Sequence, residues 1–250
     1  MNICLFSNEE IECEQPFLSF DDKRGGHILN VLHKKEGDSL TAGIIGGADG
    51  TAVITKIDNF LKKIFFEFKP EGNGKPLNPL KMIVGFPRPI QLRRLLRDVA
   101  ALGVCELHLT GTELGEKSYM QSDLAQPQKV HELLLEGTVQ AGSTHVPRAF
   151  IHKSLNECLG ALREPQGPQG TKLICLDNVN PNCVLGQIQF SKDVPVVAAI
   201  GSERGWTDNE RRLLEQAGFI RCGMGERIMR TETAVTVAGA IILNSMGIFV

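Results

Sequence analysis

The sequence lacks a long apolar run, an excess of positive charge and any pair of cysteines at C-x-x-C spacing. Its seven cysteines are scattered and odd in number, which predicts free thiols in a reducing compartment rather than a disulfide framework or a zinc site. The best apolar stretch, residues 234–243, is shorter than the roughly 18 residues of a membrane span. Residues 1–15 carry four glutamates and neither lysine nor arginine, so we expect no secretory signal. We therefore predict a cytoplasmic protein with no membrane segment.

Several catalytic signatures are absent as well. There is no Walker A sequence, no G-x-S-x-G hydrolase elbow and no H-E-x-x-H pair, and the histidines show no metal-ligand spacing, so we predict no metal site. Gly223 and Gly225 superficially suggest a dinucleotide loop, but the third glycine of that motif is missing. The net charge of −2 argues against a protein that coats nucleic acid through bulk positive charge, although it is compatible with a local basic surface.

The hydrophobic and glycine patterns divide the chain into two parts. Residues 1–72 are mostly short β-type runs with one short helix, and residues 73–79 are a Gly/Pro stretch that we predict to be a linker. Residues 80–250 alternate strands and helices, which indicates an α/β domain with a mostly parallel sheet. The first part is expected to have strands at 39–45, 51–57 and 63–68 and a helix at 24–32. The second part is expected to have strands at 81–86, 106–109, 172–176, 194–200 and 219–222, helices at 90–102, 128–141, 154–163, 208–217 and 232–246, and a surface loop at 164–170.

The most informative feature is a pair of glycine loops, each of which follows a predicted strand and precedes a predicted helix. In the first loop, Gly201 and Gly205 permit backbone conformations that side chains forbid. Thr207 and Glu210 then have the spacing of a capping box, so a helix should start directly after this loop. A single loop of this kind is more often only a tight strand–helix turn, and it is the second loop that favours ligand binding.

The second loop, residues 223–225, leads into a helix that begins near Thr231. Both loops present backbone groups at helix N-termini, where polar ligands bind readily. Ile228 and Met229 add an apolar wall. An adenine ring needs this combination of polar backbone at its edge and aliphatic surface on its faces.

Together the loops closely resemble the cofactor loops of the SPOUT superfamily, specifically the bacterial 16S ribosomal RNA uridine-N3 methyltransferases. Residues 201–210 read G-S-E-R-G-W-T-D-N-E, where that family commonly has G-P-E-G-G-F/W-S/T-x-x-E. Residues 224–234 read M-G-E-R-I-M-R-T-E-T-A, where it has L-G-x-R-I-L-R-x-E-T-A. Residues 27–33, followed by Gly37 and Asp38, also match the family's H-x-x-x-V-L-R and G-D. The resemblance covers essentially the whole chain.

This resemblance implies a PUA-like, RNA-binding β-barrel domain at 1–72 and a SPOUT methyltransferase domain with a C-terminal trefoil knot at 80–250. It also implies a homodimer, S-adenosylmethionine as cofactor, and 16S ribosomal RNA of the small subunit as substrate. The residues expected to bind the cofactor are Leu176, Ile200, Gly201, Ser202, Gly205, Met224, Gly225, Ile228, Met229 and Thr231.

Methylation of uridine N3 requires removal of a proton or stabilisation of the uridine anion, because the attacking nitrogen needs a lone pair. Arg230 is the first candidate for stabilising the anion, since a guanidinium stays charged and offers several donors. Glu232 and Glu203 are candidates for a base or an orienting group. The alternative for Glu232 is a first-turn glutamate that complements the helix dipole, and the alternative for Glu203 is an ion pair with Arg204 or Arg227.

Contacts to RNA are expected from two basic clusters, for which the alternative is an ordinary solvated surface. Phosphate contacts of this kind add affinity without sequence information. The candidates are Arg24, His27, His33 and Lys34 in the first part and Arg88, Arg93, Arg94 and Arg97 in the second.

Several positions depart from the family pattern, and among them His33, Ser202 and Arg204 stand where the family has arginine, proline and glycine. The family's glutamate at the end of the first catalytic-domain helix is Ala101 here, and a glutamate and an arginine further on are Val139 and Ser143. Two alternatives therefore stay open, namely a SPOUT methyltransferase with a different RNA target and an RNA- or ribosome-binding protein that keeps the fold without catalysis.

Overall fold

The computed structural model describes residues 2–162 and 170–249, and the chain forms two compact units. Unit 1 comprises Met1–Pro76 with Thr138–Val146, and unit 2 comprises Leu77–Gly137 with Pro147–Val250. The sequence pattern placed all of 80–250 in the second part, so the membership of Thr138–Val146 in unit 1 is a difference. Its physical reason is hydrogen bonding over long sequence distance, in which Gly46 N donates to Thr144 O and Thr144 Oγ1 donates to Gly47 O. Hydrogen bonds between residues so far apart in the sequence cannot be predicted from the local periodicity of apolar residues.

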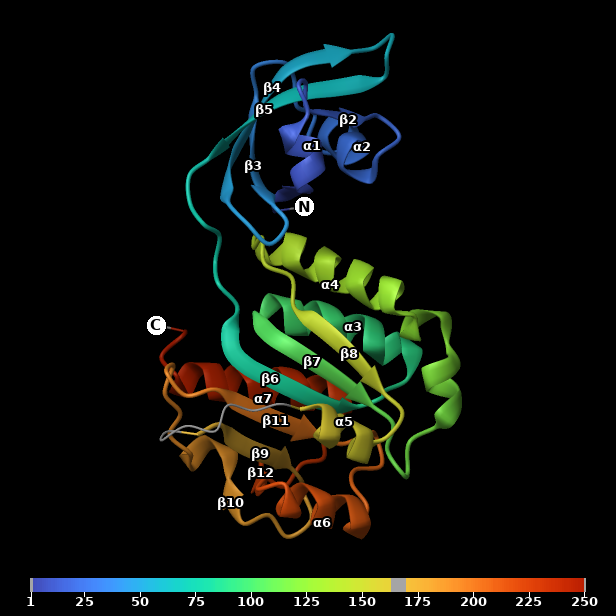
Figure 1. Ribbon diagram of the computed structural model, residues 1–250, viewed down its shortest axis with the longest axis vertical. Helices are drawn as coiled ribbons and strands as arrows, with labels where there is room; N and C mark the ends of the chain where they lie inside the picture. Colours follow the sequence, from blue (N-terminus) through green and yellow to red (C-terminus); the bar gives the residue numbers. More distant parts are fainter. Residues whose placement is uncertain (1, 163–169, 250) are drawn as a thin grey trace. The chain divides into compact units, whose positions relative to one another are not determined.

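Unit 1 is built on a five-stranded sheet of order β1-β3-β4-β5-β2, drawn in blue to cyan in Figure 1. Strands β3, β4, β5 and β2 pair antiparallel, and β1 pairs parallel with β3. The three predicted strands and the predicted helix all form, whereas β1, β2 and α1 were not predicted. The elements are β1 (Cys4–Phe6), α1 (Asn8–Glu12), β2 (Phe17–Ser19), α2 (Lys23–Asn30), β3 (Ser39–Ile44), β4 (Asp49–Asp58) and β5 (Lys63–Pro70).

An ion-pair network around Arg24 stabilises the packing of unit 1. Its guanidinium donates to both carboxylate oxygens of Glu10, to Asp22 and to the carbonyl of Leu5. It also lies 5.8 Å from the centre of the Phe6 ring. These contacts tie α1 and α2 to the sheet, and they engage the guanidinium within the fold of unit 1.

Unit 2 is built on a seven-stranded sheet of order β10-β12-β9-β11-β6-β7-β8, in which the recorded pairs are parallel (Figure 1). The predicted α/β class with a parallel sheet is confirmed. Strand β11 reads V-V-A-A-I and is buried throughout, as expected for a central strand covered on both faces. The edge strands β8 and β10 were not predicted. The strands are β6 (Asn78–Gly85), β7 (Val104–Thr110), β8 (Arg148–His152), β9 (Lys172–Leu176), β10 (Cys183–Val184), β11 (Val196–Ile200) and β12 (Ile220–Gly223).

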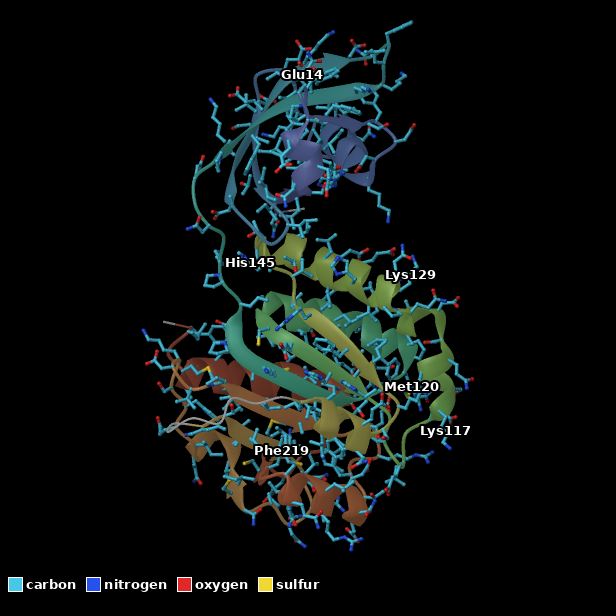
Figure 2. The ribbon with its side chains drawn as sticks, in the orientation of Figure 1. Glu14, Lys117, Met120, Lys129, His145 and Phe219 are labelled. Carbon is cyan, nitrogen blue, oxygen red and sulfur yellow. The ribbon has the colours of Figure 1, made fainter. Side chains whose placement is uncertain are left out.

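Helices cover both faces of this sheet. On one face α3 (Pro89–Ala101) packs against α7 (Thr231–Ser245). Gly239 permits the close approach of α7, because a Cβ there would lie 2.8 Å from Leu102 Cδ1 and 2.9 Å from Met82 Cε. The opposite face carries α5 (Leu155–Ala161) and α6 (Asp208–Gln216), over a core that includes Phe219 (Figure 2).

The remaining helical elements of the described ranges lie between β7 and β8 and between β10 and β11. They are α4 (Pro127–Ala141) and three short 3₁₀ turns, η1 (Lys117–Gln121), η2 (Asp123–Ala125) and η3 (Leu185–Gln187). The five helices predicted for the second part all form, with ends that differ by one or two residues. The end of the helix predicted at 154–163 and most of the loop predicted at 164–170 lie outside the described residues. No helix in the described ranges is long and apolar enough to cross a membrane.

Candidate active site

A cavity of about 250 Å³ lies at the carboxyl ends of β9, β11 and β12. This is the edge of an open parallel sheet where ligands commonly bind. Its walls come from the end of β9 and the residues after it, from the first glycine loop, and from the second glycine loop with the start of α7. All ten residues predicted to bind the cofactor line it: Leu176, Ile200, Gly201, Ser202, Gly205, Met224, Gly225, Ile228, Met229 and Thr231.

The first loop is a tight turn that depends on its glycines. Gly205 has φ +72° and donates its N–H to Ser202 O at 2.8 Å, which closes the turn. A Cβ on Gly201 would lie 3.0 Å from the Cα of Gly205. Gly85, at the end of β6, also has to be a glycine, since a Cβ there would lie 2.3 Å from Ser202 N. The loop therefore packs directly on the neighbouring strand.

The helix after this loop begins with the predicted capping box. Glu210 N donates to Thr207 Oγ1 at 3.1 Å, and Thr207 N donates to Glu210 Oε2 at 2.9 Å. The second oxygen of the buried Glu210 carboxylate accepts from Glu113 N at 2.9 Å. Glu113 in turn accepts from Thr207 Oγ1 and from Asn209 Nδ2, and these hydrogen bonds lower its pKa. The loop is thus fixed to the segment that follows β7.

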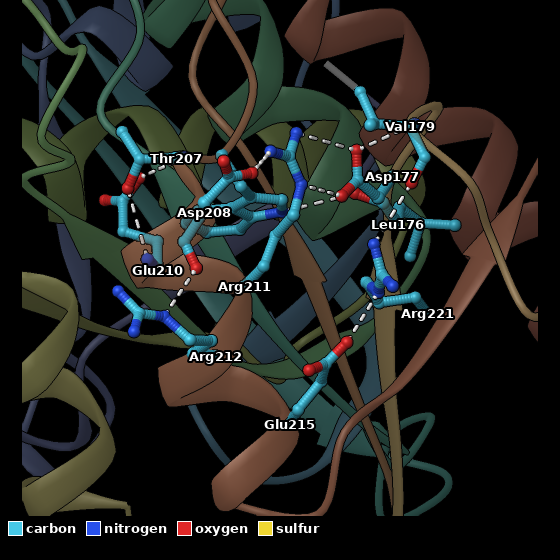
Figure 3. A network of polar contacts seen from close by, with 11 residues as sticks. Leu176, Asp177, Val179, Thr207, Asp208, Glu210, Arg211, Arg212, Glu215 and Arg221 are labelled. Atoms are coloured by element: carbon cyan, nitrogen blue, oxygen red, sulfur yellow. Dashed lines mark hydrogen bonds and ion pairs between the residues drawn. The ribbon is translucent and has the colours of Figure 1, made fainter.

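Asp177 and Arg211 form the polar side of the cavity (Figure 3). Arg211 Nε donates to Asp177 Oδ2 at 2.6 Å, and Arg211 also bonds Asp208. The Asp177 side chain is almost wholly buried, and its hydrogen bond raises the pKa of Arg211. Val179 N donates to the same carboxylate at 3.1 Å. Neither Asp177 nor Arg211 was predicted, although Asp177 directly follows a predicted strand at its carboxyl end, which was an available signal.

The second loop is more open than the first. Gly225 has φ +102°, and the side chain of Ile228 is 83% exposed at the cavity wall. Arg230 is the N-cap of α7 and makes no side-chain capping hydrogen bond. The N-terminal turn of α7 therefore faces the cavity through Thr231 and Ala234 without a capping side chain.

Comparison with known proteins identifies this arrangement. An RNA methyltransferase domain family matches residues 73–243. The ribosomal RNA small subunit methyltransferase E of Treponema pallidum is 42% identical over 97% of this chain and 91% of its own. The corresponding methyltransferase E 1 of Borreliella burgdorferi is 31% identical over 98% of both chains. The chain belongs to the ribosomal RNA small subunit methyltransferase E family.

The fold of this methyltransferase is also that of a solved relative. The crystal structure of ribosomal RNA small subunit methyltransferase E from Neisseria gonorrhoeae bound to S-adenosyl methionine aligns with a TM-score of 0.76, covers 97% of each chain and is 22% identical. The membership in a SPOUT ribosomal RNA methyltransferase family that the two loops predicted is therefore confirmed.

Of the three residues predicted to be catalytic in the methyltransferase, Glu203 lines the cavity. Its Oε1 accepts from the backbone N–H of Arg88 at 3.0 Å. The ion pair with Arg204 or Arg227, which was the alternative from the sequence, is replaced by this bond to the start of α3. Arg230 is exposed at the end of the second loop.

Glu232 is 7% exposed, and its Oε2 has no hydrogen-bond partner among the described residues. Thr236, one turn later on α7, donates to Asp98 on α3 at 3.1 Å. Gly239, on the next turn, approaches Leu102, the C-cap of α3, so the two helices run in the same direction here. Glu232 therefore lies toward the first turns of α3, where Gln91 Oε1 is also buried without a partner. Glu232 also lies in the first turn of α7, as the alternative of a glutamate that complements the helix dipole requires.

The basic residues predicted to contact RNA fall into both units. Arg24 is a correction, because its guanidinium is engaged by Glu10, Asp22 and Leu5 and serves the fold of unit 1. In unit 2, Arg88 donates to the hydroxyl of Tyr119 at 3.0 Å, and Arg97 pairs with Glu136 at 2.5 Å. The predicted residues that are exposed are His33, Arg88, Arg93, Arg94 and Arg97, while His27 and Lys34 are half-buried.

Three of the positions that depart from the family pattern are Ala101, Val139 and Ser143. Ala101 is exposed at the end of α3, and Val139 and Ser143 belong to unit 1. None of the three contributes to the cavity walls. Ser202 and Arg204, where the family's first loop has proline and glycine, do line the cavity.

Among the described residues, the buried His108, His152 and Cys158 place three metal-type donor atoms within 4.8 Å of one another. They were not predicted as a group, because they lie on β7, β8 and α5. His108 Nδ1 and His152 Nε2 are 3.0 Å apart and hydrogen-bond to each other, which satisfies both nitrogens without a metal.

Proposed function

We propose that this protein transfers a methyl group from S-adenosylmethionine to N3 of a uridine in 16S ribosomal RNA of the small subunit. The observation that carries the proposal is that both glycine loops line the same cavity. The names of the Treponema pallidum and Borreliella burgdorferi relatives, which describe small-subunit ribosomal RNA methyltransferases, also support the proposal.

The residues around the cavity fit S-adenosylmethionine. Leu176, Ile200, Met224, Ile228 and Met229 offer aliphatic and thioether surface for an adenine ring. The tight turn of the first loop brings backbone close to the cavity, and the uncapped first turn of α7 suits the carboxylate of the amino-acid part. Bound there, the sulfonium group supplies an electrophilic methyl group.

The chain's own residues have three tasks in this reaction. Arg230, exposed and permanently charged, stabilises the uridine anion that forms when N3 loses its proton. Glu232 is the candidate proton acceptor or orienting group, because its buried oxygen has no partner in the described part of the chain. Glu203 positions the first loop through its bond to Arg88 N.

The exposed arginines of α3, with His27, His33 and Lys34 on a PUA-like unit 1, are proposed to contact RNA phosphates. Such contacts supply affinity, while the choice of nucleotide is made elsewhere. Action on ribosomal RNA would place the protein in the cytoplasm. No metal is invoked for any step.

We further propose a homodimer and a C-terminal trefoil knot. The exposed apolar side chains of Val179, Ile220 and Ile228 near the cavity support a partner surface. The knot is expected from membership in the SPOUT family, and in this chain the end of α7 is held to the segment that leads into β11, where Phe190 N donates to Ser245 Oγ at 3.0 Å. Ser245 Oγ donates to Ile188 O at 3.3 Å in the same segment.

The experiment is methyl transfer from labelled S-adenosylmethionine to small ribosomal subunits that lack native modification, followed by nucleoside mass spectrometry. A 3-methyluridine product is expected. A different methylated nucleoside would replace the uridine assignment and point to the Ala101, Val139 and Ser143 departures. Cofactor binding without any methylated product would favour a non-catalytic RNA-binding protein.

A further inference from the structure

Two thiols meet at the outer edge of the sheet in unit 2, beside the cavity but outside the proposed chemistry. Cys183 on β10 and Cys222 on β12 are register partners on neighbouring parallel strands. Their Sγ atoms are 3.1 Å apart. Neighbouring strands are separated by about 4.8 Å, which lies within the Cα separation that a disulfide accepts. The two sulfurs need to approach by only about 1 Å to bond.

The two thiols differ in access. Cys222 is fully buried, and Cys183 is half-buried. Cys183 Sγ also contacts Arg221 O at 3.8 Å, and Cys222 Sγ contacts Ile220 O at 3.5 Å. Across residues 2–162 and 170–249, no second pair of cysteines has a recorded sulfur–sulfur contact. Of the two thiols, Cys183 is therefore the one that a small oxidant reaches first, and Cys222 reacts second.

The pair is connected to the cavity on both sides. Cys222 lines the cavity and is followed directly by the second glycine loop. Its carbonyl accepts from Asp177 N at 3.0 Å, and Arg221 O accepts from Asn182 N at 2.9 Å. A covalent bond between β10 and β12 would thus fasten the segment after β9 to the strand that carries the second loop.

We propose that Cys183 and Cys222 form a dithiol site that is reversibly oxidised to an intramolecular disulfide by a peroxide. In the first step the Cys183 thiolate attacks one peroxide oxygen, the O–O bond breaks, and a sulfenic acid and water form. In the second step Cys222 sulfur attacks the sulfenic sulfur, the S–O bond breaks, and a second water leaves. The two thiols lose two electrons and two protons in total, and hydrogen peroxide is reduced to two waters.

The rate of the second step is limited by Cys222. Burial, together with the neighbouring Cys183 thiol, raises the pKa of Cys222 to about 12. Because the thiolate is the nucleophile, disulfide formation accelerates as the pH rises. The short distance between the two sulfurs offsets the low thiolate fraction of Cys222, since Cys222 does not have to diffuse to reach the sulfenic acid of Cys183.

The test treats the purified full-length protein with hydrogen peroxide at pH 7 and pH 9, without cofactor or RNA, so its outcome does not depend on the proposed function. Free thiols are alkylated and the digest is analysed by mass spectrometry. We expect the Cys183 and Cys222 thiols to disappear together, a peptide pair joining residues 183 and 222, and full reversal by dithiothreitol. The melting temperature of the oxidised protein should rise by about 5 °C, because the cross-link closes a long loop.

The matched variants are Cys183→Ser and Cys222→Ser, with Cys105→Ser as the control. The S–H of Cys105 donates to Leu80 O on β6, away from Cys183 and Cys222. Oxidation should leave the melting temperature of Cys183→Ser unchanged and should raise that of Cys105→Ser as it does for the unaltered protein. The proposal is overturned if peroxide converts Cys183 to a sulfinic acid while Cys222 stays alkylatable, or if the disulfide recovered joins other cysteines. These peptide measurements on the unaltered protein decide the matter even if Cys222→Ser does not fold.

Discussion

Trp206 donates its indole N–H to the carbonyl oxygen of Leu176 at 3.2 Å. The first residue closes the first glycine loop and the second ends β9, so this one hydrogen bond joins two walls of the cavity. The indole is 2% exposed and packs in the core under α5 and α6. The shape of the cavity is therefore coupled to the packing of the sheet beneath it.

Replacing Trp206 with phenylalanine keeps an aromatic ring in the core and removes the hydrogen bond. We expect the free energy of unfolding to fall by about 1–3 kcal/mol, since the buried Leu176 carbonyl loses its recorded donor and a smaller ring leaves a void. The affinity for S-adenosylhomocysteine should fall several-fold as the two walls loosen. Denaturant unfolding and calorimetric titration measure the two effects. An unchanged affinity together with the expected stability loss would show that the hydrogen bond does not shape the cavity.

Removing Arg211 tests the polar wall. In Arg211→Ala the almost wholly buried Asp177 carboxylate loses its ion-pair partner, which costs about 3 kcal/mol of folding stability. The control is Arg212→Ala on the same helix, whose side chain is exposed and whose one recorded contact is a long bond to Asp208 O. Urea unfolding of both variants and of Asp177→Asn/Arg211→Ala gives the comparison. Equal stability of the two single variants would contradict the structural importance of the pair.

The two glycine loops could be predicted because their signals are local. Gly201, Gly205, Thr207 and Glu210 lie within ten residues and specify a turn and a capped helix without reference to the rest of the chain. The same local logic located the helices of unit 2 to within two residues. What the sequence could not give was the partner of each polar side chain. Glu203 was predicted to be a base or an orienting group, with an ion pair to Arg204 or Arg227 as the alternative, yet it accepts from the backbone N–H of Arg88, which is far away in the sequence.

Non-local pairing explains the other misses as well. Cys183 and Cys222 meet only because β12 is inserted between β9 and β10. Strand β10 has two residues, too few for any periodicity. Arg24 was predicted at an RNA surface from its place in a basic cluster, but Glu10 on another helix neutralises it. A charge run in the sequence does not report which of its members already has a partner.

Arg230 separates an enzyme from a binding protein. We expect Arg230→Ala to reduce turnover by roughly a hundredfold or more, since it removes a donor to the developing anion. The affinity for S-adenosylhomocysteine should change less than threefold, because the Arg230 side chain is exposed and is not part of the cavity wall. Single-turnover methylation and calorimetric titration are the measurements, with Arg212→Ala as the control. A parallel loss of affinity and turnover would assign Arg230 to cofactor binding instead.

Glu232 offers a test in which stability and activity move in opposite directions. Its Oε2 is buried without a recorded partner, and a buried polar atom that lacks a hydrogen bond costs folding stability. Glu232→Gln removes the charge and keeps the shape, and we expect an equal or higher melting temperature together with a loss of methyl transfer. Residues retained for function at the expense of stability behave in this way. Loss of stability with retained activity would return Glu232 to a purely structural role at the start of α7.

The buried pair His108 and His152 predicts how stability depends on pH. Burial lowers the pKa of both rings, and the groups that face them are Glu106, Lys81 and Arg148 around the sheet and Glu157 and Cys158 on α5. A ring whose pKa is lower in the folded state binds protons more readily when the chain is unfolded. Its stabilising contribution is therefore complete above the unfolded pKa of about 6.5 and is lost as the pH falls below it.

We accordingly expect the free energy of unfolding to fall between pH 7 and pH 5, by up to about 1.4 kcal/mol per pH unit for each ring. Urea unfolding at half-unit intervals measures the slope. His152→Gln keeps a hydrogen-bonding side chain opposite His108 Nδ1 but does not titrate, so its slope should be shallower than that of the unaltered protein. His131→Gln, on the exposed surface of α4, is the matched control and should leave the slope unchanged. If the slopes of all three proteins coincide, the histidine pair does not set the acid sensitivity, and the carboxylates around it do.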